Sequence, residues 1–352
     1  MRTAFHPFLP NGPFGDPVLW VDLPDEGHSV LIDLGELHAV PARKLLRVGR
    51  VVVSHTHMDH FIGFDHLLRL LLGRESELVV TGPAGFLDHV AGKLAGYAWN
   101  LIESYPVCLV AEEIDGDVVR SATYRGANRL RRTDTTTRPF TGKLHDHRAY
   151  TIEARVFDHG IPVLGVVLRE TERLSVDKDR LTRRGLTAGP WLRTLKHAVR
   201  RREPRGTEIE IPQPGGGVLH RPIGELADEI LFRAEGQALG YLTDLRFTPP
   251  NVERAVELFA GVDLLVCEAV FLHADEELAR SRGHLTARQA GELARGVGAR
   301  RLAPFHFSPR YAEREQDLCD EAADAFGGPL VRLSPLGDSN LMAPGPSRLG
   351  DV

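Results

Sequence analysis

Three histidines and one aspartate lie within six residues, directly after the apolar run 51–53. They form the segment His55-x-His57-x-Asp59-His60. Because His55 and His57 are two positions apart, they point the same way in an extended chain and can bind one metal ion. Asp59 and His60 lie past the following turn and can reach a second ion beside it. Imidazole and carboxylate ligands suit zinc, and with no cysteine nearby the site is not a closed structural one.

The motif also has the surroundings of a metal-binding turn. The β-branched run before it predicts a strand, and the apolar spacing over 61–72 predicts a helix after it. The competing interpretation is a polar loop with a chance run of histidines, and it leaves this strand–turn–helix context unexplained.

Three further polar residues stand where apolar runs end, namely His159, Asp244 and His306. Taken singly, each is a candidate surface or capping residue. If their strands are neighbours, however, the three side chains converge on the 55–60 motif. Asp244 then bridges two ions and leaves room for the hydroxide that a hydrolytic site needs. The expected ligand sets are His55, His57 and His159 for one ion, and Asp59, His60 and His306 for the other.

The elements that must position these residues alternate along the chain. Residues 18–22 and 29–33 predict a hairpin, and 125–147 predicts a loop or extended hairpin. Because helices alternate with strands and the early strands come in hairpins, we expect two mixed sheets packed together with helices outside. The other strands are expected at 50–53, 77–81, 106–111, 118–124, 150–157, 161–168, 238–244, 262–267, 301–305 and 330–333. The helices are expected at 41–47, 61–72, 86–96, 250–260, 286–296 and 312–326.

Composition sets broad limits on the function. The chain has 352 residues, 42% of them hydrophobic, and a net charge of −5, so it can form one large core or two modest domains. This net charge is not the strongly basic charge of a protein that binds nucleic acid over its whole surface, so any basic patch must be local. Cys108, Cys267 and Cys319 lie far apart, which favours a reducing compartment. Without an apolar signal core or a window as long as a membrane span, we expect a soluble, cytoplasmic protein and no membrane partner.

One segment is strongly basic. Residues 178–205 contain ten Lys or Arg and two acids, and a Pro/Gly-rich stretch follows as far as Gly217. This pattern predicts an insertion that projects from the core, and its cations favour contacts with phosphates. The alternative is a solvated helix face.

Together these motifs resemble the metallo-β-lactamase superfamily, and within it the ribonuclease Z branch of tRNA 3′-processing endonucleases. The resemblance implies a four-layer αββα sandwich of the α+β type as a single domain over 1–352. The arm or lid inserted at 170–217 would lie between the third and fourth metal motifs. It also implies two Zn²⁺ ions per chain, with Mn²⁺ or another divalent ion as the alternative. The motifs that carry it are Asp33, His55-x-His57-x-Asp59-His60, His159-x-x-Pro162-x-x-Gly165, Tyr241-Leu-Thr-Asp244, Gly283-His284-Leu285-Thr286 and His306-x-Ser308-x-Arg310-Tyr311.

The resemblance further implies the reaction, which is hydrolysis of a phosphodiester to remove the 3′ trailer from precursor tRNA. Asp59 would accept the nucleophile's proton, and His284 would give a proton to the leaving 3′-oxygen. Ser308 and Arg310 would hold a phosphate, although a helix cap with an exposed arginine is an equally good interpretation. Asp33 is expected to support the ligands rather than bind metal.

Some positions depart from the family pattern. Tyr241 stands where a carboxylate often supports the acid histidine, so the residue that supports His284 is not identified. Precursor tRNA or another RNA is the expected substrate. The resemblance also implies a homodimer in which one subunit's arm serves the other's site. The alternative is a hydrolase of a small phosphodiester, ester or lactone. A third candidate is a non-enzymatic RNA-binding module that keeps zinc for folding. It is disfavoured, because a structural zinc needs fewer ligands than the seven proposed here.

Overall fold

A computed structural model describes residues 5–171 and 173–335. The chain divides into two compact units. Unit 1 comprises residues 1–145, 152–168 and 237–352, and unit 2 comprises residues 146–151 and 169–236. The expected single domain over 1–352 includes residues 1–4, 172 and 336–352, which lie outside the described residues. No described helix is long and apolar enough to cross a membrane.

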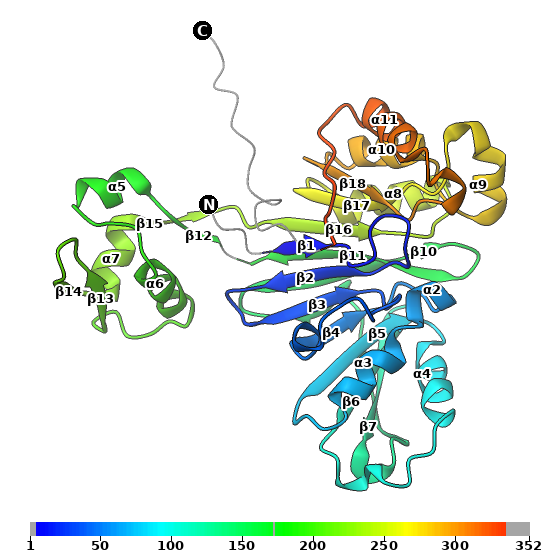
Figure 1. Cartoon of the computed structure of the whole chain (residues 1–352), viewed down its shortest axis with the longest axis horizontal. Coiled ribbons are helices and arrows are strands. Elements are labelled where there is room, and N and C mark those ends of the chain that lie inside the picture. Colours follow the sequence, from blue (N-terminus) through cyan, green and yellow to red (C-terminus); the bar gives the residue numbers. More distant parts are fainter. Residues whose placement is uncertain (1–4, 172, 336–352) are drawn as a thin grey trace. The chain divides into compact units, whose positions relative to one another are not determined.

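Unit 1 contains two β-sheets (Figure 1). The eight strands of the first sheet pair in chain order, from β1 to β8. They are β1 His6–Phe8, β2 Leu19–Leu23, β3 His28–Ile32, β4 Val48–Val52, β5 Glu77–Pro83, β6 Cys108–Asp115, β7 Val118–Arg125 and β8 Arg132–Pro139. The second sheet has the order β18-β17-β16-β11-β10-β9. Its strands are β9 Lys143–Asp146, β10 Tyr150–Asp158, β11 Pro162–Glu170, β16 Ala238–Leu242, β17 Leu264–Glu268 and β18 Leu302–Phe305.

Central strands of the sheets are buried on both faces. In β3, Leu31 joins an apolar cluster with α3 and α4, whereas its neighbours Val30 and Ile32 are fully buried but point to the other face. Helices therefore cover the outer face and the other sheet covers the inner one, as the predicted αββα sandwich requires. The helices beside the first sheet are α1 Ala42–Leu45, α2 Met58–Phe61, α3 Phe64–Leu71 and α4 Phe86–Ala95. Those beside the second are α8 Pro249–Phe259, α9 Glu276–Arg282, α10 Ala287–Gly296 and α11 Glu315–Phe326.

The parallel strands matter most for the site. Strand β3 runs parallel to β4, and β16, β17 and β18 run parallel to one another. In such sheets the carboxyl ends of parallel strands meet at one edge, where ligands bind. The chain therefore turns out of several strands at the same edge of unit 1.

The structure corrects some expected elements. The helix expected over 61–72 is broken between α2 and α3. The backbone of Gly35 packs against this break, and a Cβ at Gly63 would lie 2.1 Å from the carbonyl oxygen of Gly35. The strand expected at 330–333 is only an isolated bridge between Leu302 and Leu330. Conversely, the region 125–147 contains the strands β8 and β9.

Unit 2 contains the basic segment and has an apolar core of its own. Leu181, Trp191, Leu195, Ile211 and Leu226 are among the buried residues of this core. Residues 170–217 belong to this unit, which continues to Gly236. Its elements are β12 Arg173–Val176, α5 Lys178–Arg183, α6 Trp191–Arg200, β13 Glu208–Pro212, β14 Val218–Pro222, α7 Ile223–Ile230 and β15 Leu231–Ala234.

Candidate metal centre

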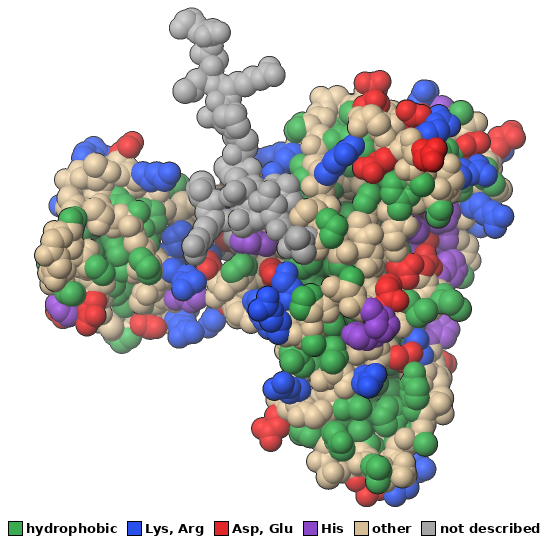
Figure 2. Space-filling view, in the orientation of Figure 1, with side chains coloured by type: hydrophobic (Ala, Val, Ile, Leu, Met, Phe, Trp, Pro, Cys, Tyr) green, Lys and Arg blue, Asp and Glu red, His purple; other side chains and the backbone are tan. Residues whose placement is uncertain are grey.

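Seven predicted ligands lie together at the strand-end edge of unit 1. The first four lie in the turn after β4 and in α2, and each of the other three follows a strand of the second sheet. Their ligand-type atoms form two neighbouring groups, and the atoms of each group lie within 4.8 Å of one another. The groups are His55, His57, His159 and Asp244, and Asp59, His60 and His306. In the space-filling view, histidine and acidic side chains lie close together on the surface near α2 (Figure 2).

The backbone turns sharply where three of these strands end. Asp33, Asp244 and His306 have φ angles of 64°, 50° and 59°. This left-handed region costs free energy for residues other than glycine, and such strain concentrates at functional sites. The turns aim the side chains into the pocket rather than along the sheet.

Asp244 lies between the two ligand groups. Its Oδ2 is 3.5 Å from Nε2 of His55 and 3.6 Å from Nε2 of His159. Its Oδ1 is 3.5 Å from Nε2 of His60 and 3.0 Å from Nδ1 of His306. One carboxylate therefore presents one oxygen to each group, which is the geometry of a bridging ligand.

The second group closes around Asp59. Its Oδ2 is 3.5 Å from Nε2 of His60 and 3.5 Å from Nε2 of His306. The side chain of Asp59 is 43% exposed, whereas those of His60 and Asp244 are almost fully buried. Asp59 thus lies on the solvent side of the ligand groups.

Two predicted ligands each have a ring nitrogen with no hydrogen-bond partner in the part of the chain that the structure describes, so it is free to bind a metal ion. Nε2 of His55 and Nε2 of His60 are buried and have no hydrogen-bond partner among the described residues. An unpaired buried polar atom is costly, and both atoms face the pocket. Ligands that each lie roughly 2.1 Å from a tetrahedral zinc ion are roughly 3.4 Å apart, which is close to the separations around Asp244.

The electrostatics also call for positive charge. Burial would lower the pKa of His60, but the carboxylates of Asp244 and Asp33 outweigh it and raise that pKa to about 10. Burial likewise opposes a charged Asp59, yet the hydrogen bond with His306 and the charge of His60 lower the pKa of Asp59 to about 2. Burial lowers the pKa of His55 to about 2, so this imidazole is neutral and its lone pair is free for a metal.

Other side chains orient the ligands. Asp33 accepts hydrogen bonds at Oδ2 from the Tyr241 hydroxyl at 2.7 Å and from the Ser54 hydroxyl at 2.9 Å. The same oxygen is 2.8 Å from Nδ1 of His60, so Nε2 of that ring points into the pocket. Nδ1 of His159 likewise donates to the carbonyl of Gly283 at 2.8 Å. Such partners fix the tautomer and direction of a metal-binding imidazole.

His284 lies beside the pocket and has a partner that the sequence did not identify. Its Nδ1 is 2.9 Å from Oε2 of Glu268, a fully buried residue at the end of β17. Burial would lower the pKa of His284, but the Glu268 carboxylate raises it. Glu268 and His284 also form a possible cation group with Asp244 and His306. However, Oε1 of Glu268 already accepts the backbone N–H groups of residues 245 and 285, so Glu268 supports His284 rather than offering a free ligand.

The two predicted phosphate-binding residues lie just after the His306 turn. Ser308 precedes the 3₁₀ turn Pro309–Tyr311 without a side-chain cap hydrogen bond. The Arg310 guanidinium is 3.5 Å from Oδ2 of Asp275 and lies 5.9 Å from the ring centroid of Phe271. Its side chain is 47% exposed, so it is held in place but open to solvent.

Comparisons with known proteins agree with this site. A family model described as beta-lactamase superfamily domain matches residues 216–307. Ribonuclease Z of Deinococcus radiodurans is 34% identical over 322 residues, which cover 89% of this chain and 93% of that protein. The chain belongs to the ribonuclease Z family.

Two solved structures share the fold of this chain. The metallo-β-lactamase fold protein YhfI from Bacillus subtilis aligns with a TM-score of 0.53 and 15% identity, over 94% of this chain and 97% of that one. The short form of human tRNase Z aligns with a TM-score of 0.51 and 17% identity, over 94% of this chain and 96% of that one. The predicted metallo-β-lactamase fold is therefore confirmed. Membership of this family implies the use of divalent metal ions, and the histidine and aspartate groups fit that use.

Proposed function

We propose that this protein is a zinc-dependent endoribonuclease that removes 3′ trailers from precursor tRNA. The observation that carries the proposal is the bridging position of Asp244 between two groups of ligands, with the His284–Glu268 pair beside them. The first group would hold one Zn²⁺ and the second group would hold another. The proteins named ribonuclease Z and tRNase Z to which the chain is similar support RNA as the substrate.

The chain's own residues would carry the proton transfers. When bound, two divalent ions lower the pKa of a water molecule and stabilise charge on phosphoryl oxygens. Asp59 is ionised and lies on the open side of the pocket, so it would accept the nucleophile's proton. Because the Glu268 carboxylate favours a protonated ring, His284 would donate a proton to the leaving 3′-oxygen. Glu268 holds Nδ1 of His284 and leaves Nε2 to face the substrate.

Ser308 and Arg310, which follow the His306 turn, would bind a phosphate of the RNA. Arg310 keeps its exposed guanidinium against Asp275 and Phe271, so its position is set before the substrate binds. A charged donor held in this way binds phosphate with less entropic cost than a free side chain.

Unit 2 would bind the body of the tRNA. Eight of the ten cations counted between residues 178 and 205 are exposed, and only Lys196 and Arg200 are half-buried. Some are neutralised within the unit, since Arg184 pairs with Glu229 and Arg205 with Asp228. Figure 2 shows basic and acidic side chains interspersed on the visible face of this unit. Arg183, Arg193 and Arg201 have no ion pair in the described part of the chain and would contact phosphates.

The deciding experiment gives the zinc-loaded protein three substrates. They are a precursor tRNA with a 3′ trailer, a small phosphodiester and a lactone. We expect cleavage of the tRNA at the trailer junction, with a 3′-hydroxyl on the tRNA and a 5′-phosphate on the trailer, and loss of cleavage after chelation. Efficient turnover of the small phosphodiester or the lactone without tRNA cleavage would instead assign the site to a small-molecule hydrolase.

A further inference from the structure

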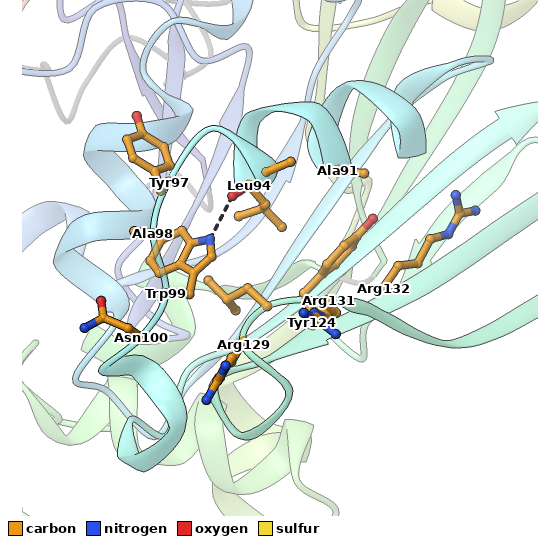
Figure 3. A pocket seen from close by; sticks show the side chains of 12 residues that line it. Ala91, Leu94, Tyr97, Ala98, Trp99, Asn100, Tyr124, Arg129, Arg131 and Arg132 are labelled. Atoms are coloured by element: carbon orange, nitrogen blue, oxygen red, sulfur yellow. Dashed lines mark hydrogen bonds between the residues drawn. The ribbon is translucent and has the colours of Figure 1, made fainter.

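A cavity lies in unit 1 at the far end of helix α4 from the metal-binding turn. It has a volume of about 540 Å³, within the range of roughly 300–1,000 Å³ for ligand pockets. Its walls come from the last turns of α4, the connection 97–100, the turn 129–131 and the first residue of β8 (Figure 3). None of these residues contributes to the metal centre.

Aromatic rings form one side of this pocket. Trp99 is half-buried, and its indole N–H donates to the carbonyl of Leu94 at 2.7 Å, which holds the ring in place. Tyr97 packs edge-on against Trp99 with the ring centroids 5.7 Å apart. Tyr124 is almost fully buried and forms part of the floor. Fixed aromatic faces of this kind stack on the bases of unpaired nucleotides.

Arginines form the other side, on a turn that is held rigidly. Arg129 and Leu130 have φ angles of 52° and 50°, so two successive residues other than glycine adopt the left-handed conformation. The turn stays in place because Leu130 is buried in the core and Gly126 packs tightly against the backbone. A Cβ at Gly126 would lie 2.4 Å from the carbonyl oxygen of Tyr105, so only glycine fits there. Strain of this kind persists only where the surrounding structure holds the backbone in place.

The charge on this turn is only weakly neutralised. Arg131 is exposed and has no ion pair within the described ranges 5–171 and 173–335. Arg129 pairs with Glu103, and Arg132 is 3.3 Å from Asp88, but the carboxylates are 54% and 86% exposed. Exposed pairs contribute little free energy and can exchange for a phosphate.

Helix α4 links this pocket to the metal centre. Near its start, Nδ1 of His89 is 2.7 Å from the hydroxyl of Thr56, which lies inside the metal motif. The ten residues of α4 then span roughly 15 Å to the pocket. A single strand that leaves the metal centre along this helix reaches the pocket within a few nucleotides.

We propose that this pocket binds an unpaired nucleotide of the RNA substrate, with its base stacked on Trp99 and a flanking phosphate bound by Arg131. The inference rests on the proposed function, since it assigns the pocket to the same substrate. The 3′ trailer is an unpaired part of such an RNA and adjoins the scissile bond.

Direct binding of a short single-stranded oligoadenylate tests the pocket. The chain has three tryptophans, and Trp20 and Trp191 are only 0% and 5% exposed, so quenching of tryptophan fluorescence reports on Trp99. We expect oligoadenylate to quench the wild-type protein and not Trp99→Phe. Fluorescence anisotropy of labelled oligoadenylate should show about 5- to 150-fold weaker binding by Trp99→Ala.

Arg131→Ala gives a second, independent test that does not disturb the core. We expect the slope of log affinity against log salt to fall by about 0.7, the value for one phosphate contact on a single strand. Arg295→Ala is the matched control, because Arg295 is exposed at the end of α10 and belongs to no described ion pair. The control should bind oligoadenylate like the wild type.

The outcomes separate this proposal from the proposed function. If Trp99→Ala and Arg131→Ala bind oligoadenylate as tightly as the wild type, the pocket proposal is wrong even when precursor tRNA is cleaved. Altered sedimentation of Arg131→Ala with unchanged RNA affinity would also overturn it and assign the surface to protein–protein contact. If the wild type binds oligoadenylate at Trp99 but cleaves no precursor tRNA, the proposed function fails and the pocket remains.

Discussion

Among single residues, Asp59 and Asp244 divide two tasks that one carboxylate could not perform together. Asp244 is buried and faces both groups of ligands, so it is suited to hold ions. Asp59 is the more exposed carboxylate, and a substrate can approach it. We therefore expect the chemistry to depend on Asp59, and the assembly of the site to depend more on Asp244 and the imidazoles.

We predict that Asp59→Ala abolishes hydrolysis and leaves the chain folded, since the side chain is partly exposed and contributes little to the core. Turnover of precursor tRNA and thermal unfolding measure the two effects. Asp117→Ala, at an exposed turn between β6 and β7, is the control and should behave like the wild type. His60→Ala should also abolish hydrolysis, but it removes a buried partner of Asp33 and should lower the melting temperature. Normal turnover in either site variant contradicts the assigned roles.

The proton donated by His284 matters only when the leaving group is a strong base. We predict that His284→Ala lowers kcat on precursor tRNA about 10²- to 10⁴-fold, and that Glu268→Gln lowers it less. A nitrophenyl phosphodiester, whose leaving phenolate is a weak base, should lose much less activity in both variants. Equal losses on the two substrates would show that His284 holds the site together rather than donating a proton.

Among the elements, the carboxyl ends of parallel strands explain both what the sequence could predict and what it could not. A polar residue after an apolar run pointed to His159, Asp244 and His306, and the structure brings all three to the 55–60 motif. The same signal was present at Glu268, which ends the buried strand β17. Its partner His284 lies 16 residues further on, and only the tertiary fold brings the two side chains together.

Other elements were predicted wrongly or left between a loop and a hairpin because their causes are not local. The break between α2 and α3 depends on the approach of Gly35 to Gly63, which lie 28 positions apart. The strand β8 forms through pairing with β7, although its sequence is polar and exposed. Tertiary contacts override local propensity in such cases.

The helices α5 and α6 carry the prediction for RNA binding. We predict that replacing Arg183, Arg193 and Arg201 by glutamine raises KM for precursor tRNA at least tenfold and reduces the salt dependence by about one unit for each lost phosphate contact. Glutamine keeps the apolar stems, so the core of unit 2 should remain intact. Hydrolysis of a small phosphodiester should not change. A matching loss on the small substrate would argue against an RNA-binding arm.

For the whole molecule, the resemblance to ribonuclease Z predicts a homodimer in which one subunit's arm serves the other's site. Mixing Asp59→Ala subunits with subunits that carry the three arm substitutions tests this. A mixed dimer would have one intact site served by one intact arm, so we expect more activity than the two variants show separately. Sedimentation measures the dimer itself. A monomer, or no gain on mixing, would contradict the shared arrangement.

The central claim is that Asp244 joins two metal ions at the edge where the strands of unit 1 end. Anomalous diffraction at the zinc absorption edge, from crystals of the zinc-loaded protein, tests it most directly. We predict two peaks, one among His55, His57 and His159 and one among Asp59, His60 and His306, each roughly 2.0–2.2 Å from an oxygen of Asp244. A single peak, or two peaks that do not share Asp244, would contradict the account.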